Sequence, residues 1–193
     1  MITHIQGRLV ELNPAYVVIE CNGIGYLLNI SLNTYSNLGE SESCKLYSHL
    51  VIKEDSHTLY GFHNKLERQI FRLLISVSGV GASTARVILS SMLPEEIRDA
   101  IVSENIALIT SVKGIGAKTS QRIILDLKEK MLKAFDNIEI TLKSGNRNRE
   151  EALSALEVLG FPMKAVHKMI DKLLNENPDM EVEELVKKAL KQF

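Results

Sequence analysis

The sequence of 193 residues contains no tryptophan and only two cysteines, and the shortage of cysteine narrows the possible classes of protein. Cys21 and Cys44 are too few for a disulfide scaffold and lack the spacing of a zinc site. Both lie in apolar, strand-like runs, so we expect buried free thiols. No apolar run approaches the roughly 18 residues that span a membrane, and the N-terminus lacks a secretory-signal pattern. We therefore expect a cytoplasmic protein without a membrane partner.

Motifs for catalysis and cofactor binding are also missing. The five histidines, at positions 4, 49, 57, 63 and 167, have no metal-ligand spacing, and no nucleophile–base pair stands out. There is no G-x-x-x-x-G-K-[ST] loop, so the chain is not itself a P-loop ATPase. Gly79-Val80-Gly81 follows a helical run, and Thr84 stands where a dinucleotide fingerprint has its third glycine. We expect no catalytic residue, no metal and no cofactor.

Positive and negative residues nearly balance, which gives a formal net charge of −1, but they are unevenly distributed along the chain. Residues 1–63 carry 3 Lys/Arg against 6 Asp/Glu, residues 64–146 carry 12 against 9, and residues 147–193 carry 8 against 9. The middle segment is therefore the basic one. A nucleic-acid binder needs positive charge locally rather than over the whole chain, so this distribution agrees with such a function.

Residues 1–63 have the composition of a small β-domain. They are rich in Val, Ile, Leu and Tyr, and turn signals such as Asn22-Gly23 separate the apolar runs. The predicted strands are Ile5–Leu12, Tyr16–Cys21, Gly25–Ile30, Lys45–Lys53 and Thr58–Phe62. They predict an OB-like β-barrel, although an SH3-like barrel fits the pattern nearly as well. The last two strands flank Glu54 and Asp55, whose simplest interpretation is a solvated hairpin tip.

Residues 64–135 are predicted to be helical and contain a short repeat. Val77–Thr84, VSGVGAST, returns 35 residues later as Val112–Thr119, VKGIGAKT. Apolar helical runs precede and follow each copy, so the repeat predicts two units of helix, tight turn and helix. The helix after the second copy is expected from Lys118 to Phe135.

The chemistry of the repeated turn favours binding of phosphates. Glycine tolerates a left-handed φ and lets another backbone approach closely. The first amides of the following helix have no intrahelical acceptor, and the helix dipole adds positive charge there. Purely structural hairpins with glycine C-caps are the alternative, but the recurrence of alanine and threonine favours phosphate binding. The candidate residues are Gly79, Val80, Gly81, Ser83, Thr84 and Arg86 in the first copy, and Gly114, Ile115, Gly116, Lys118, Thr119 and Arg122 in the second.

The last part of the chain is predicted to be a separate helical module. Residues 136–149 lose helical periodicity and have the composition of a flexible linker. Residues 150–193 recover it in three pieces, which Gly160 and Asn177-Pro178 separate. So small a core predicts marginal stability, which suits a partner-binding role. The chain is thus an α+β multidomain protein.

The two G-[VI]-G turns resemble tandem helix-hairpin-helix motifs, which bind DNA backbone without reading sequence. With the barrel, the Tyr60-Gly61-Phe62 segment after the acidic hairpin and the C-terminal module, the whole chain resembles the RuvA family. Members of that family are the Holliday-junction recognition subunits of bacterial RuvAB branch-migration complexes, and they are not enzymes. The resemblance implies a homotetramer, possibly two per junction, that holds a four-way junction open and square for recombination and DNA repair.

The resemblance also implies roles for residues and partners. Glu54 and Asp55 match the family's acidic pin, whose carboxylates repel phosphates at the junction centre. The C-terminal module would contact a RuvB-type hexameric ATPase, and a RuvC-type resolvase would be a further partner. The candidate motor contacts are Leu156, Leu159, Gly160, Phe161 and Met163, although these residues could instead form the core of the module.

The sequence departs from the family in its hairpin turns. Family members often carry lysine there, but this chain has Ala82 in the first turn and Ala117 before Lys118 in the second. Binding of DNA phosphates by the first turn would then depend on backbone amides and Ser83. Two other functions stay open: a DNA-repair enzyme of the nuclease or glycosylase type that carries the same motif, and an adaptor that binds only proteins.

Overall fold

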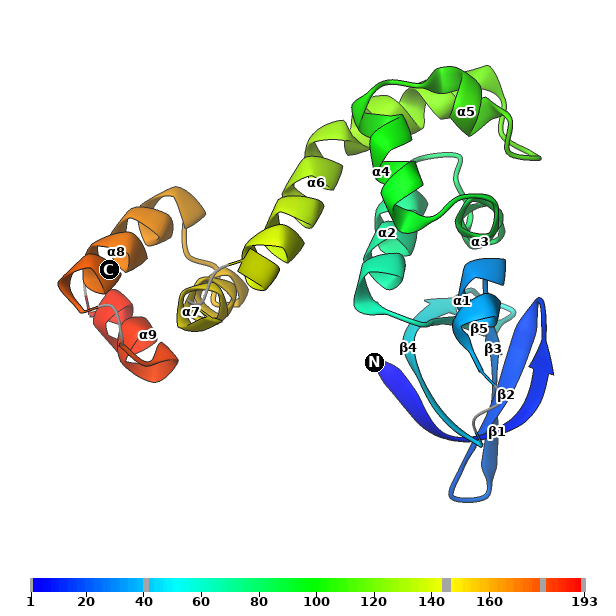
Figure 1. Ribbon diagram of the computed structural model, residues 1–193, viewed down its shortest axis with the longest axis horizontal. Helices are drawn as coiled ribbons and strands as arrows, with labels where there is room; N and C mark the ends of the chain where they lie inside the picture. Colours follow the sequence, from blue (N-terminus) through cyan, green and yellow to red (C-terminus); the bar gives the residue numbers. More distant parts are fainter. Residues whose placement is uncertain (1, 40–41, 144–146, 178–179, 192–193) are drawn as a thin grey trace. The chain divides into compact units, whose positions relative to one another are not determined.

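The computed structural model describes residues 2–39, 42–143, 147–177 and 180–191 and divides into two compact units. The first unit is Met1–Ala134 and the second is Phe135–Phe193. Figure 1 shows the order of the elements. The first unit holds a β-barrel, helices α1 to α5 and most of α6, and the second unit holds α7 to α9.

The strands form a closed barrel in the order β1-β2-β3-β5-β4. Their bounds are β1 (His4–Asn13), β2 (Tyr16–Cys21), β3 (Ile24–Asn29), β4 (Ser43–Ile52) and β5 (His57–Phe62). β3 pairs with β5 in parallel, whereas the other pairs are antiparallel. All five predicted strands are confirmed. A closed barrel with a helix between β3 and β4 is the OB-like arrangement rather than the SH3-like one.

Strand alternation fills the barrel with apolar side chains, including Ile19, Leu28 and Leu46. The cysteines correct one expectation. Both are free, but Cys21 and Cys44 are only half-buried, because they pack at the margin of this core rather than inside it. Partial burial, followed by the neighbouring Cys21, raises the pKa of the Cys44 thiol.

Helix α1 (Leu32–Asn37) between β3 and β4 was not expected from the sequence. Four of its six residues, Asn33, Thr34, Ser36 and Asn37, are short and polar, and such side chains compete with helical hydrogen bonds. Long-range contacts stabilise the helix instead. The Ser31 hydroxyl caps it by accepting from Thr34 N at 2.9 Å, and the Ser31 and Thr34 hydroxyls donate to the carboxylate of Glu67, which lies on α2.

The helical part of the first unit follows the predicted order. Its helices are α2 (Lys65–Ile75), α3 (Ala82–Ser91), α4 (Pro94–Val102), α5 (Ile106–Thr110) and α6 (Ala117–Lys143). Pro94 starts α4, a position that suits proline, and the Glu96 carboxylate accepts from Leu93 N at 2.8 Å. Buried Phe71 contacts Tyr60 and Phe62 of β5 with ring centroids 5.0 and 4.9 Å apart, so α2 packs on the barrel.

Helix α6 is longer than the sequence pattern indicates. It continues through residues 136–143, so this part of the expected linker is helical. The pattern was misleading because a helix, once formed, can continue beyond the end of its apolar stripe. Residues 144–146 of the expected linker lie outside the described residues. The domain limits at residues 63 and 149 stay predictions.

The second unit consists of α7 (Arg147–Val158), α8 (Met163–Glu176) and α9 (Val182–Leu190). Its core includes Leu153, Leu156, Val166, Ile170 and Leu185. Gly160 ends the first of these helices with a φ of +85°, which a side chain would disfavour. Among the described residues, no helix is both long and apolar enough to cross a membrane.

Candidate nucleic-acid interface

The first hairpin turn joins α2 to α3. Gly79 has a φ of +91°, the left-handed conformation that glycine tolerates best. Val80 N donates to Val77 O at 3.0 Å, which closes the turn, and the Val80 side chain is 5% exposed. Gly81 is the N-cap of α3 and makes no side-chain cap hydrogen bond. The first amides of α3 therefore lack a side-chain acceptor from their own cap residue.

The second turn repeats this geometry between α5 and α6. Gly114 has a φ of +89°, Ile115 N donates to Val112 O at 3.1 Å, and Ile115 is also 5% exposed. Helix α6 begins directly after Gly116. The expectation of two repeated units of helix, tight turn and helix is confirmed, and one buried apolar side chain fills each turn. Both turns present glycine backbone and the start of a helix, which together suit an anion.

Side chains next to the two helix starts differ in charge. Ser83 and Lys118 are exposed, at the second position of α3 and α6, and Thr84 and Thr119 behind them are half-buried. Lys113 is also exposed and precedes the second turn. The second turn thus carries two ammonium groups of its own, whereas the first carries none.

The barrel brings a cation to the first turn. A cleft of about 390 Å³ lies between the base of the β4–β5 hairpin and the start of α3, and its lining includes Lys53, Gly81, Ala82 and Ser83. Lys53 is exposed, and residue spacing alone could not place it there, because it is far from the repeat in sequence. It can supply the positive charge that Ala82 does not.

The two candidate arginines have different environments. The Arg86 guanidinium donates to Ala15 O at 3.0 Å and to Asn29 Oδ1 at 2.9 Å, so it holds α3 against the barrel. Its role as a phosphate ligand stays a prediction. Exposed Arg122 lies on α6 and donates to Ser78 O at 3.3 Å, which brings its charge to the first turn.

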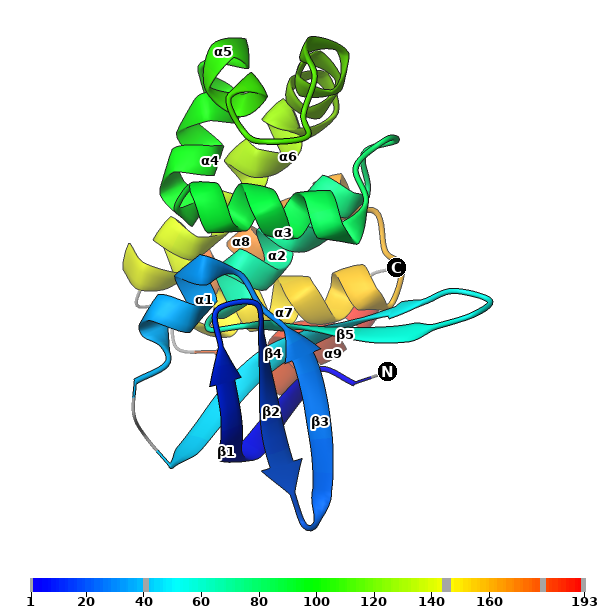
Figure 2. The same ribbon diagram turned by 90° about the vertical axis from the view of Figure 1, so that its right-hand side faces the viewer.

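The acidic hairpin lies between β4 and β5. Lys53 N donates to Ser56 O at 2.8 Å and closes the turn, and both Glu54 and Asp55 are exposed. Neither carboxylate takes part in an ion pair with the described residues. Figure 2 shows this hairpin and the first hairpin turn projecting to the same side of the unit. Negative charge without an ion-pair partner among the described residues is thus carried by a hairpin on the same side of the unit as the candidate phosphate site.

The candidate motor contacts of the second unit separate into two groups. Leu156 is fully buried in the core, so its prediction as an exposed contact is wrong. Phe161 and Met163 are half-buried against that core. Leu159 is 57% exposed beside Val158, at 85%, which the sequence reasoning missed. The helical stripe identified the buried side chains, and the exposed edge is Val158, Leu159 and Gly160.

Among the residues that the structure describes, no group of three or more His, Cys, Asp or Glu side chains could hold a metal ion. The buried carboxylate of Glu67 is occupied by hydroxyl donors from Ser31 and Thr34.

A closed five-stranded barrel followed by two glycine-turn hairpins defines the class of tandem helix-hairpin-helix proteins. Comparison with family models agrees. Residues 1–61 match the RuvA N terminal domain, residues 71–129 match the SAM-like Helix-hairpin-helix tandem, and residues 147–193 match the RuvA C-terminal domain. The chain belongs to the RuvA family.

Full-length relatives support this assignment. The chain is 59% identical to a protein of Christiangramia forsetii over all of both chains, and 55% identical to one of Flavobacterium psychrophilum over 99% of each. A protein of Bacteroides thetaiotaomicron is 46% identical over the full length of both. Each is named Holliday junction branch migration complex subunit RuvA.

Proposed function

We propose that this protein is the non-catalytic subunit that binds four-way DNA junctions and presents them to a RuvB-type ATPase for branch migration. The observation that carries the proposal is the pair of glycine turns with one backbone geometry, each leading into a helix start that has a cation near it. Backbone amides and ammonium groups bind phosphates of any sequence. The function therefore requires recognition of DNA shape rather than of bases.

Selectivity for a junction comes from the arrangement around its centre. The hairpin turns supply affinity, whereas Glu54 and Asp55 disfavour a phosphate at their own position. A continuous duplex crossing the acidic hairpin would bring phosphates against these carboxylates. At a four-way junction the strands diverge, so the hairpin can occupy the open centre.

A gel-shift competition between a four-way junction and linear duplex of the same sequence tests this function. We expect the junction to bind more tightly, with affinity falling steeply as salt rises, since each phosphate contact releases counterions. Equal binding of junction and duplex would contradict the proposal. Incubating the same junction with protein and Mg²⁺ tests the alternative of a repair enzyme, for which strand cleavage would be expected.

The acidic hairpin has its own test. Changing Glu54→Gln together with Asp55→Asn removes both charges but keeps similar side-chain sizes. We expect junction binding to persist and duplex binding to strengthen, because the repulsion of phosphates is lost. Unchanged discrimination between the two DNAs would remove this hairpin from the mechanism.

The partners are expected to follow the family. Exposed Val158 and Leu159, beside Gly160, form an apolar edge on the second unit that suits the motor. Leu159→Ala should leave junction binding intact and weaken co-sedimentation with the RuvB-type ATPase.

A homotetramer, with one or two tetramers per junction, would arrange the hairpin turns around four arms. A RuvC-type resolvase would act on the same opened junction, and the work would take place in the cytoplasm.

A further inference from the structure

Two free thiols lie in one row that crosses three strands of the barrel. Cys44 on β4 is the Cα partner of Gly7 on β1. On the other side of β1, Arg8 pairs with Glu20 of β2. Because β1 and β2 are antiparallel, Cys21 is the next residue of β2 and stands opposite Gly7. We call Cys21, Gly7 and Cys44 the thiol row.

The thiol row faces the inside of the barrel. Side chains alternate along a strand, and the residues two positions away on the same three strands, Ile5, Ile19 and Leu46, are buried in the barrel core. Both cysteines pack at the margin of that core and are half-buried. The strands therefore fix where the thiols lie, while solvent still reaches them.

Glycine leaves the middle of the thiol row without a side chain. The Cys21 Sγ lies 2.9 Å from the position that a Gly7 Cβ would take, and it donates to Gln6 O at 3.0 Å. Cβ positions of directly opposite residues are about 4.5–5.5 Å apart, so the Cys44 Cβ lies within roughly 8 Å of that sulfur. Rotation about the Cα–Cβ bond of Cys44 can bring its own sulfur closer still.

A disulfide does not fit this geometry. The whole of β1 separates the two cysteines, which places their Cα atoms two strand spacings apart, roughly 8–10 Å. A disulfide requires Cα atoms within about 7 Å of each other. A bridging metal ion has a longer reach, because two metal–sulfur bonds of about 2.3 Å let the sulfurs stay about 4.6 Å apart, against about 2 Å in a disulfide.

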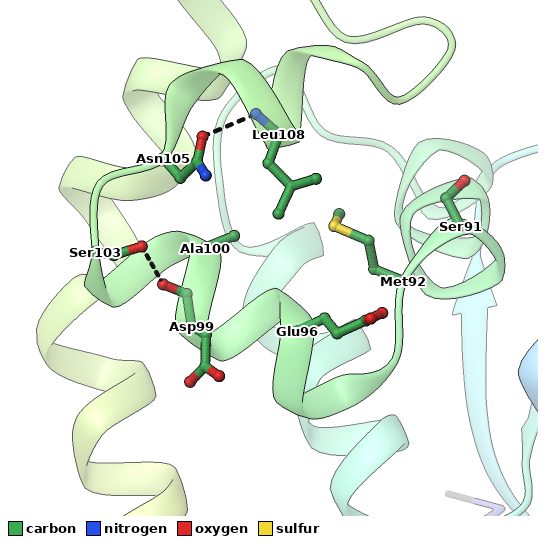
Figure 3. A pocket seen from close by; sticks show the side chains of 8 residues that line it. All are labelled: Ser91, Met92, Glu96, Asp99, Ala100, Ser103, Asn105 and Leu108. Carbon is green, nitrogen blue, oxygen red and sulfur yellow. Dashed lines mark hydrogen bonds between the residues drawn. The ribbon is translucent and has the colours of Figure 1, made fainter.

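A cavity of about 340 Å³ on helices α3 to α5 offers other donors, but they are already engaged. Figure 3 shows its carboxylates, Glu96 and Asp99, together with the thioether of Met92. Glu96 accepts from Leu93 N, and Asp99 forms an ion pair with Arg98. The thiol row is therefore the better candidate for binding a metal ion.

We propose that Cys21 and Cys44 bind one soft monovalent metal ion, such as Cu(I), between their sulfurs. Thiolates are the ligands that Cu(I) prefers, and two of them suffice for it. Zn²⁺ takes three or four protein ligands, and the described ranges contain no group of three His, Cys, Asp or Glu side chains for it. Each thiol loses its proton to solvent as a sulfur–copper bond forms, so no oxidant is needed. The ion would connect β2 to β4 across β1.

Anaerobic competition with the coloured Cu(I)–bicinchoninate complex tests the site in the full chain. We expect uptake of one Cu(I) per chain, with an affinity that rises with pH because two protons leave. Cys21→Ser and Cys44→Ser should each abolish this uptake, since one thiolate cannot replace the pair. Thermal unfolding of the unmodified chain should shift upward by roughly 5–10 °C when free Cu(I) is about a hundred times its Kd.

The controls separate shared binding by two thiols from other causes. Val18→Ser introduces serine at a half-buried position of β2 outside the thiol row and should keep the uptake, and circular dichroism should show native structure in every variant. The proposal is overturned if the unmodified chain takes up no Cu(I), if either cysteine variant still binds one ion, or if Zn²⁺ binds equally well. Formation of a Cys21–Cys44 disulfide by diamide in the folded chain would also overturn it. No DNA is present, so the outcome is independent of the proposed function.

Discussion

The two hairpin turns of the first unit share one backbone geometry but differ in everything around it. Both have a glycine with φ near +90°, a closing hydrogen bond of 3.0 or 3.1 Å and one buried apolar plug. The first turn follows α2, of 11 residues, and takes its cations from Lys53 and Arg122 elsewhere in the fold. The second follows α5, of 5 residues, and carries Lys113 and Lys118 itself.

This difference shows that the local motif specifies the shape of the turn but not its charge or its support. Helix α2 is anchored to the barrel side through Glu67 and α1. The short α5 is held by a hydrogen bond of 2.8 Å between the hydroxyls of Thr110 and Ser120. An ion pair of 2.6 Å between Lys128 and Glu104 supports the same region and lowers the pKa of Glu104. The turns should therefore respond differently to mutation.

The largest expected effect concerns the plug of the second turn. Ile115→Ala should lower the free energy of unfolding by about 2–5 kcal/mol, because it leaves a cavity under a helix pair with few other contacts. Val80→Ala in the first turn removes fewer atoms and should cost less. Urea denaturation measures both, with exposed Ile106→Ala as the control. A larger loss for Val80→Ala would reverse the comparison.

Substitution of Arg86 and of Arg122 should distinguish an arginine that stabilises the fold from one that binds DNA. Arg86→Met removes charge-assisted hydrogen bonds to the barrel and should cost about 1.5–3 kcal/mol of stability. Arg122→Met loses only an exposed contact, worth at most about 1 kcal/mol, but should reduce the salt dependence of junction binding. Thermal unfolding and salt-series gel shifts distinguish them. If Arg86→Met altered the salt dependence instead, Arg86 would belong to the DNA interface.

Substitution of the left-handed glycines should show that the two turns have the same backbone conformation. Gly79→Ala and Gly114→Ala each force a side chain into a left-handed φ and should each cost about 1–2 kcal/mol. A Cβ at either position meets nothing within 4 Å, so the cost is backbone strain alone. Gly81→Ala and Gly116→Ala are matched controls in open space without a positive φ. Equal losses at all four positions would mean that φ is not the reason for glycine.

Substitution of single lysines shows which residue provides the positive charge for phosphate binding at each turn. Lys118→Ala should lower the slope of log affinity against log salt by about 0.9, the value for one phosphate contact. Ser83→Ala should change it little, whereas Lys53→Ala should match Lys118→Ala if the barrel supplies the first turn. Gel shifts across a salt series measure all three. A stronger effect of Ser83→Ala than of Lys118→Ala would show that the first turn depends on its own side chain.

The smallest expected effect is a pH dependence of the anchor of α2. Burial raises the pKa of Glu67 above its usual value, against hydrogen bonds from Ser31 and Thr34 that lower it. The folded state then holds this proton more tightly than the unfolded state. Stability from this group is therefore full below the unfolded pKa and falls as pH rises through the folded pKa. Glu67→Gln should remove that fall in denaturation curves, and an unchanged pH profile would contradict it.

Prediction from the sequence succeeded where local pattern and conformation coincide. The five strands and the two glycine turns were expected at their observed places. It failed for α1, a six-residue helix that is too short to show a helical stripe, and for the end of α6, which continues beyond the apolar stripe. Leu156 was assigned to an exposed edge, but its place in the stripe of α7 made it core.

The sequence by itself determined the conformation of the hairpin turns and the family of the chain. A glycine at a left-handed φ and an apolar plug next to it are local requirements, and residues a few positions apart satisfy them. Tertiary structure alone decided that Lys53 lies beside the first turn, that Arg86 holds the barrel and that Arg122 reaches Ser78. Long charged side chains have no conformational signature, so their partners depend on which distant segments the fold brings within hydrogen-bonding distance.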